Sequence, residues 1–220
     1  MLLTPALSGV SKMILPLAYL VRLAPTERHI AMLDRMVEDL MKHRDPATGA
    51  LADVFGNPTE GHGLYGPFES NEQYGRHESP VIQKNGDPCS DSLYTASFAM
   101  LTLTEAEAAV RAAGRQALAA RYAEYATSLA DYHVRIQMVS REMPTYNGIW
   151  FRGFDFEKWE TYGSDGDAGW GVFCIETGWS QSWISSALSL RAMGTDLWSY
   201  TRKTSVGRHI DTLVAEMLSE

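Results

Sequence analysis

The sequence has few cysteines and no long hydrophobic run. Only Cys89 and Cys174 occur among the 220 residues, so at most one disulfide can form and the chain is not a disulfide scaffold. No Cys/His cluster has the spacing of a zinc site, and we expect no metal and no cofactor. The longest apolar stretch, residues 13–21 (MILPLAYLV), has nine residues, which is too few for a membrane span.

Positive charge is also scarce. The chain has 19 Lys and Arg against 27 Asp and Glu, a net charge of −8, so it has no general electrostatic reason to bind nucleic acid or anionic lipid. No signal peptide is visible, because residues 13–21 lie deep in the chain and lack a basic start. A cytoplasmic and a periplasmic location both stay open. The length and the 45% hydrophobic content predict a single globular domain over residues 1–220.

Most of the periodic segments predict helices in antiparallel pairs. In residues 26–45, Thr26 can cap the helix, and a set of apolar residues falls on one face. That set is Ile30, Leu33, Val37, Leu40 and Met41. A second pair is predicted from a helix capped by Ser90 or Asp91 and a helix that starts with a capping box, Thr104 and Glu107. The remaining helices are expected over residues 5–23, 176–194 and 204–220.

Two segments do not show a helical pattern. Residues 46–88 are rich in Gly, Pro and polar residues, and a loop of about 40 residues in a compact domain is usually functional or disordered. Its aromatic residues argue against disorder. Residues 148–162 alternate bulky with small or polar residues, which predicts a short β-hairpin. No βαβ alternation or nucleotide-binding motif occurs.

All six tryptophans lie in the last third of the chain, and most of them lie in or beside a glycine-rich, acidic segment. Any single Trp is more often a core residue than a binding residue. An exposed indole, however, offers a flat apolar face for a sugar ring. The candidate substrate-binding residues are Trp150, Arg152, Trp159, Trp170, Trp179, Trp183, Tyr74 and Arg76, the two arginines being able to hold a substrate carboxylate.

The acidic residues offer a pair of carboxylates. Asp165 and Asp167 fit turn chemistry as well as catalysis, and they lack the other ligand positions of a Ca²⁺ loop. Glu176 also fits a helix start. Glycoside cleavage needs two carboxyl groups about 5 to 9.5 Å apart, and residues 69–78 could supply the second. The candidate catalytic residues are Asp165, Asp167, Glu176, Glu72, His77 and Glu78, with Glu69 nearby.

Three stretches together resemble bacterial carbohydrate-active proteins with the six-hairpin glycosidase fold. They are GIWFRGFDFEKWETYGSDGDAGWGVFCIETGWSQSWI (148–184), DPATGALADVFG (45–56) and NGDPCSDSLYTASFAMLTL (85–103). The resemblance is specific in the first stretch and weak in the others. It implies an all-α fold in which antiparallel helical hairpins form part of an (α/α)6 toroid, with long loops building a sugar-binding cleft at one end.

A complete toroid of this kind needs about twelve helices, and we expect about six. The resemblance therefore implies either the C-terminal part of a longer protein or an incomplete ring. An incomplete ring would be completed by a partner, for example in a homo-oligomer.

The pattern favours a glycoside hydrolase acting on an oligo- or polysaccharide, with a carbohydrate as the partner. Two alternatives stay open. One is a polysaccharide lyase, in which Arg76 or Arg152 neutralises a uronate and His77 or a Tyr takes the proton. The other is a non-catalytic carbohydrate-binding or assembly module.

Overall fold

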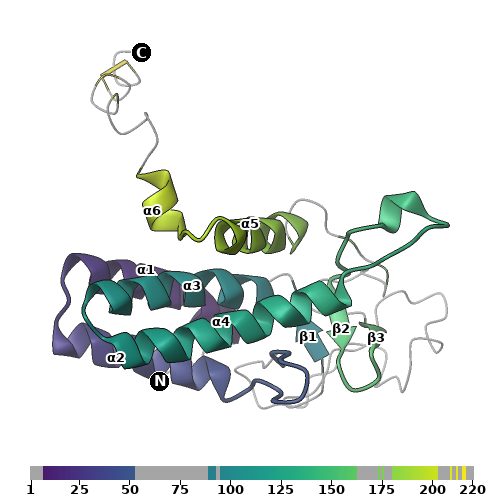
Figure 1. The fold of residues 1–220 in the computed structure, drawn as a ribbon, viewed down its shortest axis with the longest axis horizontal. Helices are drawn as coiled ribbons and strands as arrows, with labels where there is room; N and C mark the ends of the chain where they lie inside the picture. Colours follow the sequence, from purple (N-terminus) through teal and green to yellow (C-terminus); the bar gives the residue numbers. More distant parts are fainter. Residues whose placement is uncertain are drawn as a thin grey trace.

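The computed structural model describes residues 7–52, 89–92, 95–162, 173, 175, 180–202, 209, 212, 215 and 216. This part of the chain is mainly helical, with one small sheet, which confirms the expected fold class (Figure 1). Its helices are α1 (Leu7–Leu23), α2 (Glu27–Met41), α3 (Ala96–Ala112), α4 (Gln116–Ile136), α5 (Ser180–Ala192) and α6 (Leu197–Thr201). A short 3-10 helix, Pro144–Tyr146, follows α4. None of the helices in these ranges is long and apolar enough to cross a membrane.

Helix α2 forms as its sequence predicts. The Thr26 side chain accepts a hydrogen bond from the backbone N–H of His29 at 3.2 Å, which caps the helix. The five apolar residues predicted to share one face are all buried, because their helical spacing turns them toward α1 and α3. Helices α1 and α2 therefore form the first hairpin of the fold.

The boundary between α3 and α4 differs from the prediction. We expected a helix to start at Thr104, but α3 runs unbroken from Ala96 to Ala112. The Thr104 hydroxyl donates to the carbonyl of Met100 at 3.0 Å, so it serves the interior of a helix and not a cap. The chain turns ten residues later, at Gly114 (φ +77°), where Arg115 N–H donates to Val110 O at 2.8 Å and closes a Schellman motif.

A three-stranded antiparallel sheet stands at one end of the helices (Figure 1). Its strands, in spatial order, are β1 (Cys89–Asp91), β2 (Gly153–Asp155) and β3 (Glu160–Tyr162). Strands β2 and β3 form the predicted hairpin within residues 148–162. Ser90 and Asp91 do not cap α3 as expected, because both lie in β1 and pair with Phe154 and Gly153.

The main core lies around α3, which packs against α1, α4 and α5. Helix α3 is buried on nearly every side, so it forms the centre of the described fold. A smaller cluster, made of Ala50, Tyr132, Phe154 and Phe156, joins α4 to the sheet.

Helix α5 ends as predicted at Gly194 (φ +62°), where Thr195 N–H donates to Leu190 O at 3.0 Å. The short helix α6 follows, with Asp196 as its N-cap, and the sequence analysis missed it. The helix expected over residues 204–220 lies largely outside the described residues.

Candidate functional site

Both segments that carry the candidate acids are attached to the same end of the molecule (Figure 1). Residues 53–88 begin after Ala52, which packs on the cluster of Tyr132 and Phe154, and they end at the start of β1. Residues 163–179 begin after β3 and end at α5. Strands β1 and β3 flank β2 in one sheet, so three of the four attachment points lie on or beside that sheet. We call this region the loop-bearing end.

The fourth attachment point is the start of α5, and Trp150 holds it in place through Gln181. The Gln181 side chain, one residue into α5, accepts a hydrogen bond from the backbone N–H of Trp150 at 2.9 Å and donates to its carbonyl. Trp150 is only 5% exposed, and its indole Nε1 donates to the carbonyl of His133 at 2.6 Å. This predicted stacking residue therefore supports the loop-bearing end from inside, by joining α4 to α5.

His133 is buried beside Trp150 and carries no charge at neutral pH. Its Nδ1 lies 2.7 Å from the carbonyl of Leu129, which can only accept, so Nδ1 carries the proton and Nε2 is an acceptor. Burial lowers the pKa of His133 to about 4. Within the described part of the chain Nε2 has no hydrogen-bond partner, and neither has the buried Ser92 hydroxyl. Buried polar groups of this kind usually bind water or serve a function.

Arg152 and Asp91 form an ion pair inside the same region. Arg152 Nη2 lies 3.8 Å from Asp91 Oδ2, and both residues are buried. A buried charge is costly unless it is paired, so each residue stabilises the other. Arg152 was a candidate for holding a substrate carboxylate, and any such carboxylate would have to compete with Asp91.

Trp159 is the exposed aromatic residue of this end. It lies in the turn between β2 and β3, and 43% of it is exposed. Phe154 and Tyr132 contact its ring edge-on, with centroids 5.2 and 6.5 Å away, and the Arg135 guanidinium lies 5.4 Å from the ring centroid. These neighbours hold the indole in one orientation at the surface.

The backbone of Trp159 is also strained. Its φ of +58° is the one positive value among the described residues other than glycine. For a bulky side chain this conformation costs roughly 1 to 2 kcal/mol, and such strain is often found at functional positions.

Of the other predicted residues, only Trp183 is described, and it is half-buried against Phe98 at a ring distance of 4.6 Å. The rest lie outside the described residues. They are Tyr74, Arg76, Glu72, His77, Glu78 and Glu69 in the first segment, and Asp165, Asp167, Trp170, Glu176 and Trp179 in the second.

Sequence reasoning missed the buried polar residues His133 and Ser92. Neither belongs to a recognisable motif, and His133 occurs in an ordinary helical pattern. The pairing of Asp91 with Arg152 was missed for a different reason: the two residues are 61 positions apart and meet through the pairing of β1 with β2, which local sequence does not show.

Comparison of the chain with protein-family models, with curated proteins and with solved structures finds no match. Among the described residues, no group of three or more His, Cys, Asp and Glu side chains could hold a metal ion.

Proposed function

We propose that the protein binds and hydrolyses a glycan at the loop-bearing end. The observation that carries this proposal is Trp159, an exposed indole held at the tip of a hairpin by aromatic neighbours and a strained backbone. A flat, oriented ring suits stacking against the C–H face of a sugar, and its rigidity lowers the entropic cost of binding.

The position of Trp159 in the chain supports the same proposal. It lies on the hairpin whose second strand, β3, ends at Tyr162, directly before the segment that contains Asp165 and Asp167. Trp159 therefore precedes the candidate carboxylates Asp165 and Asp167 by six and eight residues in the sequence. The other candidate acids, Glu72 and Glu78, belong to the segment that ends at β1 of the same sheet.

The proposed chemistry uses one carboxylic acid to protonate the leaving oxygen and one carboxylate as nucleophile or as base for water. Asp165, Asp167 or Glu176 would supply one group, and Glu72 or Glu78 the other. The helical hairpins, arranged as part of an (α/α) toroid, would serve as the rigid support.

Glycan binding tests the role of Trp159. We expect Trp159→Ala to weaken binding of oligosaccharides at least tenfold in affinity electrophoresis or calorimetry, while Trp159→Phe keeps part of it. Tyr200→Ala is the matched control, because Tyr200 is an aromatic residue of α6, is 50% exposed and lies away from the sheet. Equal binding by Trp159→Ala and the unmodified protein would remove Trp159 from the site.

Product analysis tests the reaction. Asp167→Asn should lower turnover of aryl glycosides or glycans by at least a hundredfold while glycan binding persists. An unsaturated product that absorbs in the near ultraviolet would instead identify a lyase. Binding without any product in mass spectrometry would identify a carbohydrate-binding module.

A further inference from the structure

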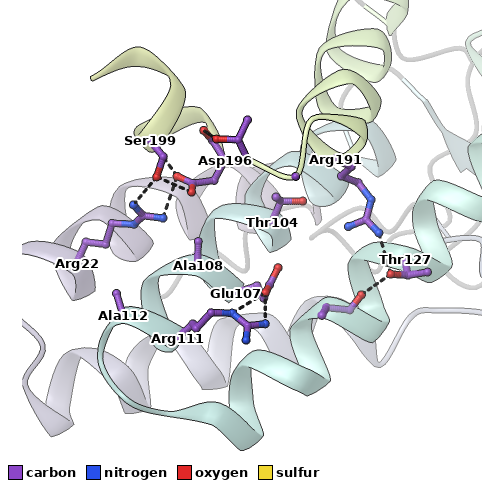
Figure 2. Close-up of a pocket in the computed structure, with 13 residues that line it drawn as sticks. Arg22, Thr104, Glu107, Ala108, Arg111, Ala112, Thr127, Arg191, Asp196 and Ser199 are labelled. Atoms are coloured by element: carbon purple, nitrogen blue, oxygen red, sulfur yellow. Dashed lines mark hydrogen bonds and ion pairs between the residues drawn. The ribbon is translucent and has the colours of Figure 1, made fainter. Parts of the chain in front are cut away.

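A pocket of about 630 Å³, lined by both polar and apolar side chains, lies between α3, α4 and the turn that joins α5 to α6 (Figure 2). It is separate from the loop-bearing end. That end lies beside the first turn of α3, near Ala96, whereas Glu107 and Arg111 line the cavity in its last turns. At 1.5 Å per residue, the distance along α3 from Ala96 to Arg111 is roughly 22 Å.

Three arginines from three helices line this cavity: Arg22 of α1, Arg111 of α3 and Arg191 of α5 (Figure 2). The described residues of the lining include two acidic ones, Glu107 and Asp196, so together they carry one net positive charge in a chain of net charge −8. The arginines differ in how fully they are neutralised.

Arg22 is neutralised by a carboxylate within the fold. Its Nη2 lies 2.9 Å from Asp196, with Ser199 as a further partner, and both side chains of the ion pair are mostly buried. Arg111 pairs with Glu107 one turn away on α3, and its side chain is 53% exposed. Ion pairs four residues apart on a helix contribute only about 0.3 to 0.5 kcal/mol, so Arg111 can exchange its partner at little cost.

Arg191 has no carboxylate partner among the described residues. Its Nη2 donates to the Thr127 hydroxyl at 2.8 Å, and that hydroxyl donates in turn to the carbonyl of Ala123 at 2.7 Å (Figure 2). The Thr127 proton is thus used in α4, and its oxygen is left to accept from Arg191. This contact orients the guanidinium through one nitrogen and leaves its other donors available.

We propose that the arginine-lined cavity binds a small, hydroxylated oxyanion through Arg191. An oriented guanidinium with free donors matches the paired oxygens of a carboxylate or a phosphate. The cavity volume of about 630 Å³ lies within the range of small-molecule sites, about 300 to 1,000 Å³. Arg111 can offer a second guanidinium to the ligand, and the carboxylate of Glu107 can accept from ligand hydroxyl groups. A uronic acid and a sugar phosphate share this chemistry, and the experiment distinguishes them.

Isothermal titration of the whole protein with glucuronate, glucose 6-phosphate and glucose tests this proposal. We expect saturable binding of one or both anions, weakening with added salt, and no binding of the neutral sugar. Arg191→Gln should reduce the affinity at least tenfold. Arg141→Gln, which removes an exposed arginine outside the cavity, should leave it unchanged.

Thr127→Val is a second variant that keeps every arginine. Loss of the hydroxyl frees the Arg191 guanidinium, and we expect a several-fold loss of anion affinity. Trp159→Ala should keep its anion binding, which separates this site from the proposed glycan site. The proposal is overturned if neither anion binds saturably up to millimolar concentration, if glucose binds as well as the anions, or if Arg191→Gln binds with unchanged affinity.

Discussion

The buried carboxylate of Glu105, in the middle of α3, accepts a hydrogen bond from the backbone N–H of Leu197 at 2.5 Å. Its second oxygen accepts from Trp198 N–H at 3.2 Å. These N–H groups belong to the first turn of α6, which has no intrahelical partner for them. Glu105 therefore holds α6 on the core from 92 residues away, and without it this five-residue helix would lose its main attachment to α3.

Glu105 should make the stability depend on pH. Burial raises its pKa above the ordinary value of 4.5, although the hydrogen bonds from Leu197 and Trp198 oppose this shift. The folded protein then holds the proton more tightly than the unfolded chain. The stabilisation is complete below pH 4.5 and is lost as the pH rises through the folded pKa.

Glu105→Gln stays neutral at every pH and lacks this dependence. We expect the melting temperature of the variant, relative to the unmodified protein, to increase from pH 4 to pH 7. Thermal denaturation at four pH values measures it, with Glu142→Gln, at an exposed position, as the control for removing one charge. A difference that stays constant across this range would contradict the assignment.

Local sequence was sufficient to predict those helix faces and helix ends that depend only on residues close together in the chain. The buried face of α2, its Thr26 cap and the end of α5 at Gly194 all follow from spacing and from single-residue preferences. The predicted helix start at Thr104 was wrong because Ser/Thr-x-x-Glu also occurs inside helices, where the hydroxyl can donate to the carbonyl four residues back. Helix α6 was missed because its stability depends on Glu105, which is distant in sequence.

The candidate site could be predicted only in part. Tryptophan clustering selected Trp159, which is exposed and stays a candidate, but the same pattern included Trp150, which is buried. A sequence shows which residues are aromatic, but burial depends on how α4 and α5 come together. The buried neighbours of that site, His133 and Ser92, have no pattern that distinguishes them from core residues.

Asp196 should stabilise α6 in two separable ways. It accepts from Ser199 N–H at 2.9 Å as the N-cap, and it pairs with Arg22 at 2.9 Å. We expect Asp196→Asn to keep the cap and lose the ion pair, and Asp196→Ala to lose both. Urea denaturation should show the Ala variant to be less stable than the Asn variant by about 1 kcal/mol. Equal stability would mean that the cap contributes nothing.

Two glycines with the same backbone conformation should respond differently to alanine. Gly114 (φ +77°) has open space around it, so Gly114→Ala should cost only the backbone strain, about 1 kcal/mol. Gly49 (φ +78°) lies against Ser128, whose carbonyl oxygen would be 2.8 Å from the new Cβ. Backbone must move there, so we expect Gly49→Ala to reduce the free energy of unfolding clearly more than Gly114→Ala. Equal losses in urea denaturation would show that this contact relaxes freely.

His133 should limit stability in acid. Burial lowers its pKa to about 4, against an ordinary value of 6.5, so the unfolded chain binds the proton first. Stability should therefore fall as the pH drops from 6.5 toward 4, by up to roughly 3 kcal/mol from this residue alone. His133→Phe keeps a ring in the core and cannot take up a proton.

The two proteins should therefore differ mainly in their pH dependence. We expect His133→Phe to lose less stability than the unmodified protein between pH 6.5 and pH 4 in urea denaturation, even if it is less stable at pH 7. An NMR titration gives a direct reading, because the His133 ring should stay neutral down to pH 5. Protonation near pH 6.5 would show that the ring reaches water or a charged partner. The assignment of His133 as a buried, neutral hydrogen-bond acceptor would then be wrong.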